Sequence, residues 1–122
     1  MQEVPDPLNK LTWDNAILIS PKLAEALGFD TKRGEFLIGG IAKRSANFRR
    51  GREQAPQAEL TVNGVTVTGP VHIQPGLPDW SVGCALGFGR SRTGRVGTGT
   101  GFNVYPLLQN SGAYVATGAQ IR

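Results

Sequence analysis

The sequence predicts a small, mainly β domain, a barrel of short strands with one or two short helices. Three observations indicate this class. The length of 122 residues suits a single domain. The 17 glycines and 8 prolines favour frequent turns over a helical bundle. About six short apolar runs are separated by turn residues, which is typical of small all-β domains.

The first residues lead into a buried strand. Residues 1–12 contain prolines and an asparagine that predict an extended leading segment. Asp14 and Asn15 are suited to an Asx turn, with Trp13 anchoring that turn to the body of the domain. Residues 16–19 form a short apolar run, which predicts a buried strand.

A helix signal follows this strand. Ser20 suits the N-cap, Pro21 suits the first helical position, and Gly28 is placed to end the helix after about two turns. Residues 35–41 predict a second strand that contains a weakening pair of glycines. Residues 42–57 are polar and basic without strand alternation, which favours a solvated loop over a phosphate-binding segment.

The strongest strand signal is a β-hairpin. The Asn-Gly pair at 63–64 lies between the apolar runs 58–62 and 65–67, and it supplies the positive φ values of a tight type I′ turn. The Gly-Pro pair at 69–70 is expected to interrupt the second strand before residues 71–73 resume it.

Further strands are expected in the second half of the chain. Residues 74–79 predict a turn, and residues 81–88 predict the strand after it. Residues 103–108 are expected to be extended. Residues 112–122 predict the last strand, with Tyr and Val at its start and Ile near its end.

Residues 80–106 form a Gly-rich stretch that carries three arginines and contains no Asp or Glu. Glycine lets the backbone approach a ligand, and successive turns of such backbone can aim N–H groups at an anion. Arginine adds a planar donor fork that matches phosphate. The stretch therefore predicts a concave, anion-accepting surface, with a basic surface loop as the alternative.

Composition limits the chemistry of the chain. Lys and Arg total 13 against 9 acidic residues, and this formal net charge of +4 favours anionic partners. Cys84 is the only cysteine, so the chain alone cannot hold a disulfide, an iron–sulfur cluster or a thiolate zinc site. His72 is the only histidine, and a hydrogen-bonded structural role is favoured over a general base. No nucleophile–base pair is evident, so we predict no catalytic residue and no metal site.

The chain carries no signal for a membrane or for export. No apolar run approaches about 18 residues, the length of a membrane span. The N-terminus lacks the apolar core of a signal peptide. Because Met1 precedes linker-like sequence, we expect a soluble fragment, one domain over residues 1–122, taken from a larger protein.

The order of these elements resembles the C-terminal, molybdopterin-dinucleotide-binding domain of the molybdopterin oxidoreductases. The resemblance implies a six-stranded double-ψ β-barrel of the aspartate-decarboxylase-like type. At residues 32–35 (KRGE) the chain departs from the acidic turn of the family. The segments that carry the resemblance are residues 16–29, 71–76, 103–107 and 113–122.

A narrower resemblance is to the large iron–sulfur subunit of alternative complex III, a quinol-oxidising electron-transfer complex at the periplasmic face of bacterial membranes. Residues 12–16 and 71–76 carry it, and above all residues 86–107, LGFGRSRTGRVGTGTGFNVYPL. Residues 43–57 do not match and are expected to be an insertion. The resemblance implies a domain that is not catalytic in isolation and does not itself enter the membrane. Its expected partners are other domains of the parent protein and subunits of the complex.

The resemblance also implies binding residues. In cofactor-binding members this domain closes over the pterin dinucleotide without supplying the metal ligand. In this chain the arginines would face phosphates, Asn103 would hydrogen-bond a heterocycle, and Trp80 or Phe102 would stack. The predicted cofactor-binding residues are Trp80, Arg90, Arg92, Thr93, Arg95 and Asn103.

The resemblance leaves the cofactor open. The alternative complex III subunit keeps the barrel without the pterin, so the same loops would pack on neighbouring domains and pair with carboxylates, and we favour this interpretation. The alternative is a domain that binds molybdopterin guanine dinucleotide in a molybdenum or tungsten oxidoreductase. A basic nucleic-acid-binding barrel is a third hypothesis, suited by residues 43–52 and the Arg/Gly stretch. It is disfavoured because aromatic residues make up only 7% of the chain.

Overall fold

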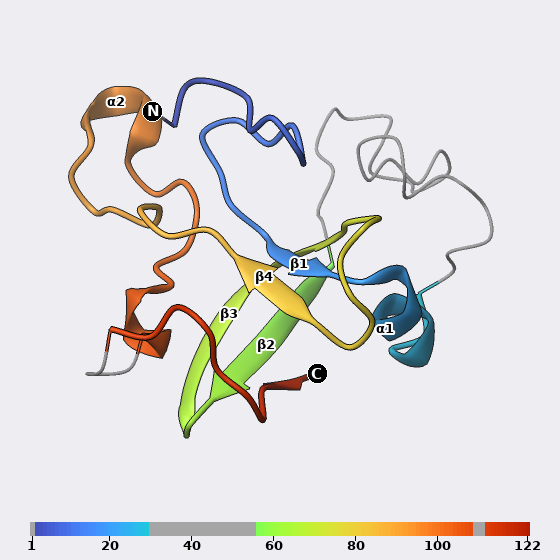
Figure 1. Ribbon diagram of the computed structural model, residues 1–122. Coiled ribbons are helices and arrows are strands. Elements are labelled where there is room, and N and C mark those ends of the chain that lie inside the picture. Colours follow the sequence, from blue (N-terminus) through green and yellow to red (C-terminus); the bar gives the residue numbers. More distant parts are fainter. Residues whose placement is uncertain (1, 30–55, 109–111) are drawn as a thin grey trace.

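The protein is mainly β in the computed structural model, which describes residues 2–29, 56–108 and 112–122. Within these ranges, five strands form one curled, mixed sheet with short helices around it (Figure 1). The strands are β1 (Ile17–Ile19), β2 (Gln57–Val62), β3 (Val65–Ile73), β4 (Val82–Cys84) and β5 (Gln120–Ile121). The helices are α1 (Pro21–Ala26), α2 (Gly94–Gly97) and the 3-10 helix η2 (Tyr105–Leu107).

The strand order of the sheet is β4-β1-β3-β2-β5. β1 and β3 run parallel, whereas the other three neighbouring pairs are antiparallel. β4 and β5 are the two edges, so the described strands form a half-barrel. The prediction of a mainly β domain with short helices is confirmed. The strand expected at residues 35–41 lies outside the described residues, as does the basic segment as far as residue 55.

The β2–β3 hairpin forms as predicted. Asn63 and Gly64 take φ values of 50° and 82°, the left-handed conformation that a type I′ turn requires. The hydroxyls of Thr61 and Thr66 lie 2.8 Å apart as a cross-strand hydrogen-bonded pair. Local turn chemistry therefore decides the register of this hairpin.

The Gly-Pro pair at 69–70 does not interrupt β3, and this prediction was wrong. The strand pairs with β2 as far as Pro70 and with β1 from Val71 onward. Gly69 lies under the ring of Phe102, where a Cβ atom would come within 2.5 Å of the ring. The pair marks the point where β3 changes neighbours, and glycine is required there for packing rather than for a break.

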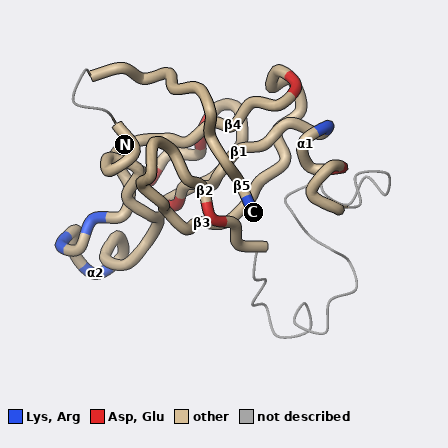
Figure 2. The backbone as a smooth tube through the Cα atoms, turned by 90° about the horizontal axis from the view of Figure 1, so that it is seen from below, with Lys and Arg blue, Asp and Glu red and all other residues tan. Residues whose placement is uncertain are grey.

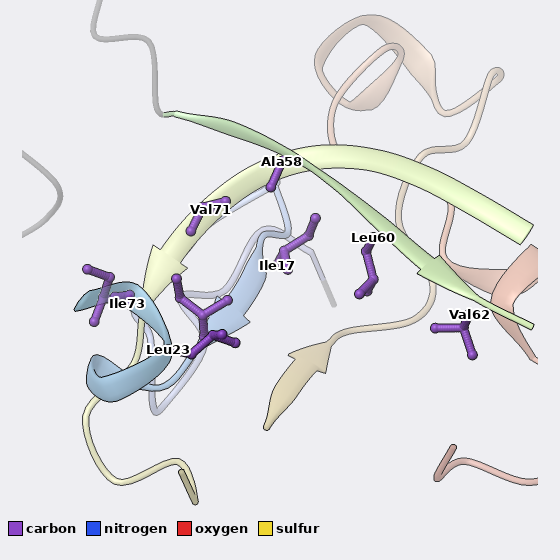
Figure 3. Packing of buried hydrophobic residues seen from close by; sticks show 9 residues of the cluster. Ile17, Leu23, Ala58, Leu60, Val62, Val71 and Ile73 are labelled. Carbon is purple, nitrogen blue, oxygen red and sulfur yellow. The ribbon is translucent and has the colours of Figure 1, made fainter. Parts of the chain in front are cut away.

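The core lies on the inner face of the curled sheet and is closed by α1 (Figure 3). Alternate residues of β2 are buried, as the pleat of a strand requires. From α1, Leu23 and Ala24 pack onto the same face. The buried cluster consists of Ile17, Ile19, Leu23, Ala24, Ala58, Leu60, Val62, Val71 and Ile73.

The capping signals of α1 are confirmed. Ser20 is fully buried, and its Oγ accepts a hydrogen bond of 3.3 Å from the N–H of Leu23. Pro21 begins the helix, and Gly28 follows it with a φ of 86°. None of the helices in the described ranges is both long enough and apolar enough to cross a lipid bilayer.

The second half of the chain contains less strand than predicted. β4 covers only the start of residues 81–88, and the segment expected to be extended at 103–108 contains η2. At the C-terminus only β5 pairs, through contacts with the middle of β2. Tyr114 and Val115 are 82% and 83% exposed, so the apolar residues that suggested a strand do not enter the core. Residues 112–119 pair with no strand among the described residues, and without the hydrogen bonds of a neighbouring strand they do not form a β-strand.

Candidate functional site

The Gly-rich stretch forms a long excursion between β4 and η2, here called the arginine loop (residues 86–101). It projects from the sheet on the side where α2 lies, and the basic residues there gather around α2 (Figures 1 and 2). Arg90, Arg92 and Arg95 are all exposed. None of them has a hydrogen bond or ion pair with any residue that the structure describes. The three guanidinium groups are therefore available to an external anion.

A buried amide holds both ends of the arginine loop. Asn15 is only 2% exposed. Its Nδ2 donates to the carbonyl oxygens of Ala85 and Phe102, both at 3.1 Å, and its Oδ1 accepts from the N–H of Phe102 at 2.9 Å. Ala85 precedes the loop and Phe102 follows it. One side chain at the start of β1 thus joins the two ends of the loop.

The place where Asn15 joins the two ends of the arginine loop is here called the neck. Two glycines allow the two backbone segments to approach closely there. A Cβ on Gly89 would lie 2.5 Å from the carbonyl carbon of Phe102, so the two backbone segments are in direct contact. A Cβ on Gly101 would lie 2.8 Å from the Oδ1 of Asn15 and 2.9 Å from the Cβ of Phe88. Both glycines also have positive φ, at 73° and 69°. The neck therefore requires glycine for space as well as for conformation.

The leading segment makes a second attachment to the loop. The side-chain amide of Gln2 donates to the carbonyl of Gly87 at 2.6 Å. Trp13 has a φ of 65°, unusual for a bulky residue, and its N–H donates to the carbonyl of Gln2 at 2.6 Å. Its ring lies beside α2, 3.5 Å from where a Cβ on Gly97 would be. Trp13 was predicted to anchor the turn to the body of the domain, but its contacts shown here are with Gln2 and with the arginine loop.

Thr93 lies at the N-cap position of α2 but does not cap it. Its Oγ1 is buried and makes no hydrogen bond, while its N–H donates to the Oγ1 of Thr98 at 3.3 Å. The hydroxyl of Thr98 in turn donates to the carbonyl of Gly94 at 2.6 Å. The Thr93 hydroxyl is therefore buried beside Gly97, whereas the three arginines are exposed.

The remaining predicted residues lie apart from one another. Asn103 is exposed at the return of the loop, and its Oδ1 accepts from the N–H of Tyr105 at 3.1 Å. Trp80 is 63% exposed and precedes β4, at the end of that strand nearest α1. The adjacent Asp79 forms an ion pair of 2.9 Å with Lys22 of α1. The structure does not bring Trp80 together with the arginines, which follow the opposite end of β4.

The main cavities do not coincide with the arginines. A cavity of about 300 Å³ lies between the leading segment and the sheet, and its charged lining residues are Asp6 and Asp14. The leading segment, predicted to be extended, folds back there because the Asp6 carboxylate accepts two backbone N–H groups. A second hollow, of about 160 Å³, is lined by apolar residues of β2, β4, η2 and the C-terminal segment. Neither is suited to an anion.

His72 and Cys84 show no sign of reactive chemistry. Burial lowers the pKa of His72, and its ring has no hydrogen bond to a described residue, contrary to the bonded role predicted for it. Burial raises the pKa of Cys84 to about 11, so its thiol stays protonated near neutral pH. Within the described ranges no group of His, Cys, Asp or Glu side chains could hold a metal ion.

Asn15 and Gln2 are the functional positions that sequence reasoning missed. Asn15 was predicted to form a local Asx turn with Asp14, and its N–H donates to the Asp14 carboxylate at 2.8 Å. Its side chain, however, bonds to residues 70 and 87 positions away. No periodicity or motif in one sequence signals a bond of that separation.

Comparison of the sequence with models of protein families finds no match, and comparison with curated proteins finds no similar sequence. The resemblance to the molybdopterin-dinucleotide-binding domain therefore stays a prediction. The cofactor, the partners and the periplasmic placement that it implies stay predictions as well. What the geometry itself provides is a basic loop whose arginines have no partner among the described residues and whose two ends are joined by a buried amide.

Proposed function

We propose that this chain is a non-catalytic, molybdopterin-dinucleotide-binding-like domain of an iron–sulfur subunit in a membrane-associated, quinol-oxidising electron-transfer complex on the periplasmic side. The observation that carries the proposal is the arginine loop. Its three guanidinium groups are exposed and have no partner in the part of the chain that the structure describes, and Asn15 ties the loop backbone to the sheet. The fold that belongs to the proposal is a six-stranded double-ψ barrel. A curled, mixed sheet with a parallel β1–β3 pair supports it.

The favoured partner of the arginine loop is a carboxylate-bearing face of a neighbouring domain or subunit. Guanidinium groups bind carboxylates in bidentate pairs, and such pairs are strongest where a contact excludes water. The arginines stand on an exposed loop and do not line the described cavities. That position suits a contact between two protein surfaces better than an enclosed small molecule.

A pterin or guanine dinucleotide is the second candidate. Five loop glycines have positive φ, a backbone form that can direct N–H groups at a phosphate. The arginines would hold the phosphates. The Nδ2 of Asn103 donates to no described residue, so it could donate to a heterocycle. Trp80 does not fit the same site, since it lies at the α1 end of β4. The bound cofactor would supply the redox chemistry, and the chain would only bind and orient it.

The proposal is tested by titrating the chain with three probes at low and high salt. The probes are poly-L-glutamate for carboxylates, a guanine dinucleotide for the cofactor, and a single-stranded oligonucleotide. We expect saturable binding of polyglutamate, which weakens with salt because exposed charges are screened. Saturable dinucleotide binding with a change in tryptophan fluorescence would favour the second candidate. Tight oligonucleotide binding with a steep salt dependence would favour the nucleic-acid hypothesis.

Matched variants separate the loop from the overall charge. Replacing all three loop arginines with alanine should weaken polyglutamate binding by about tenfold or more. A control variant loses the same charge outside the loop and should stay within about twofold of the wild type. The control changes are Lys10→Ala, Lys22→Ala and Arg122→Ala. Equal losses in both variants would show non-specific attraction and contradict the proposal.

A further inference from the structure

We propose that Asn15 is the positioning residue of the arginine loop: by closing the neck of the loop, it sets the affinity of the loop for anions. The predicted effect on affinity rests on the proposed function. The closure of the neck by Asn15 concerns this chain alone and can be tested without any ligand.

The bonding of Asn15 is almost complete. Both Nδ2 hydrogens are donated, one to the carbonyl of Ala85 and one to that of Phe102, and Oδ1 accepts from the N–H of Phe102. A side chain that is 2% exposed and makes three hydrogen bonds is held in one geometry. Asn15 therefore fixes the separation of the two chain segments at which the loop begins and ends.

Apart from the bonds of Asn15, few hydrogen bonds among the described residues hold the loop. Near the neck, Gly89 and Gly101 provide the close approach of the backbone segments but have no side chains to hold it. Within the loop, the hydrogen bonds shown by the structure are short-range ones around α2 and the bond from Gln2 to Gly87. Losing Asn15 would therefore release a segment of 16 residues, 86–101, that has few contacts of its own.

This closure matters for binding because all three arginines lie between the two attachment points. A loop with fixed ends loses less conformational entropy when it binds, so its affinity is higher than that of an open loop. Asn15 is buried at the base of the loop, and its side-chain hydrogen bonds go to Ala85 and Phe102 and not to the arginines. Asn15 would thus act on an anion only through the backbone, and it is not itself a binding residue.

Two substitutions at this position test the neck. Asn15→Asp nearly preserves the shape and keeps an acceptor for the N–H of Phe102, but it places an oxygen against two carbonyl oxygens. Asn15→Ala removes all three bonds. The control is Ser20→Ala, since Ser20 is equally buried at the other end of β1 and bonds within α1. Hydrogen exchange then measures the loop and α1 separately.

In both Asn15 variants we expect the amides of residues 86–102 to exchange about tenfold to a hundredfold faster, as expected for lost buried hydrogen bonds. Affinity for poly-L-glutamate should fall by about tenfold. Ser20→Ala should accelerate exchange in α1 and leave the loop and the affinity within about twofold of the wild type. Loop exchange that stays unchanged in the Asn15 variants, or that rises equally in Ser20→Ala, would overturn the inference.

Two further results are decisive. If the wild type shows no saturable binding of poly-L-glutamate, the proposed anion-binding function fails, and the predicted effect on affinity fails with it. Hydrogen exchange alone then decides whether Asn15 closes the neck. If the Asn15 variants do not fold, Gln2→Ala replaces them, because it removes only the bond to Gly87. Gln2→Ala should accelerate hydrogen exchange in the arginine loop by a smaller factor. Unchanged exchange in that loop would contradict the inference that side-chain amides hold it.

Discussion

A buried polar side chain flanks each end of β1, and these two side chains form hydrogen bonds over very different distances along the chain. At one end, Ser20 caps α1 by accepting from a residue three positions later. At the other end, Asn15 bonds to Ala85 and Phe102, 70 and 87 positions later. Both side chains are almost inaccessible to solvent, at 0% and 2%. The two side chains are therefore about equally buried, but the hydrogen bond of Ser20 is local in sequence and the hydrogen bonds of Asn15 are tertiary contacts.

The two ends of β1 should therefore lose different amounts of stability when a contact is removed. The α1 end has a cap, a proline at the first helical position and an apolar face in the core, so losing one contact leaves the rest. The loop end depends on the side-chain amides of Asn15 and Gln2 and on glycines that permit close contact. Changes at the neck should thus cost more than changes of similar size at the helix.

The largest effect is expected at Gly89. Gly89→Ala places a Cβ 2.5 Å from the carbonyl carbon of Phe102 and also strains a φ of 73°. Gly87→Ala is the matched control, with a φ of 92° and no atom within 4 Å of the new Cβ. We expect Gly87→Ala to lower the free energy of unfolding by about 1 kcal/mol and Gly89→Ala by about 1–3 kcal/mol more. Equal losses in urea denaturation would mean that the neck is not tightly packed.

A medium effect is expected at the helix end. Ser20→Ala removes the N-cap acceptor for the N–H of Leu23 and should lower the free energy of unfolding by about 1 kcal/mol. Chemical denaturation measures this loss, and Ser20→Thr, which keeps a hydroxyl, is the control. If Ser20→Ala costs as much as Gly89→Ala, the proposed contrast between the two ends is wrong.

A smaller effect is expected from pH. Burial lowers the pKa of His72 in the folded state, so the unfolded state binds the proton more tightly. Stability should therefore fall as the pH drops through about 6.5, the ordinary imidazole pKa. The loss should be smaller than at Ser20 because the ring is only half-buried. His72 lies opposite Leu18, the middle residue of β1, in the β1–β3 pair. Protonation of His72 should therefore destabilise both ends of β1 to a similar extent. His72→Gln should abolish this part of the pH dependence of the melting temperature.

The smallest effect is expected at the ion pair between Lys22 and Asp79. Both side chains are more than half exposed, at 56% and 59%, so water and salt screen the pair. Lys22→Ala should lower the free energy of unfolding by about 0.2–0.5 kcal/mol at low salt and by less at high salt. Arg122→Ala breaks the exposed pair with Glu59 on β2 and should cause a similarly small, salt-dependent loss of unfolding free energy. A loss above about 1 kcal/mol would show that the α1 end depends on this pair.

Part of the candidate site was predictable and part was not. Composition indicated a basic Gly-rich loop, and the structure leaves its three arginines exposed and unpaired among the described residues. Grouping Trp80 with them relied on closeness in the sequence. β4 separates the two, because the chain enters that strand beside α1 and leaves it toward the loop.

The sequence by itself determined the elements whose signals are local. The hairpin turn at 63–64 needs left-handed residues, and the start of α1 needs a side-chain acceptor, and both requirements are met by neighbours in the chain. Only the tertiary structure decided that β3 continues through 69–70 and that Asn15 closes the arginine loop. These features depend on Phe102 and Ala85 arriving from far along the chain. A hydrogen bond or a close contact of that kind exists only after the sheet has brought the segments together.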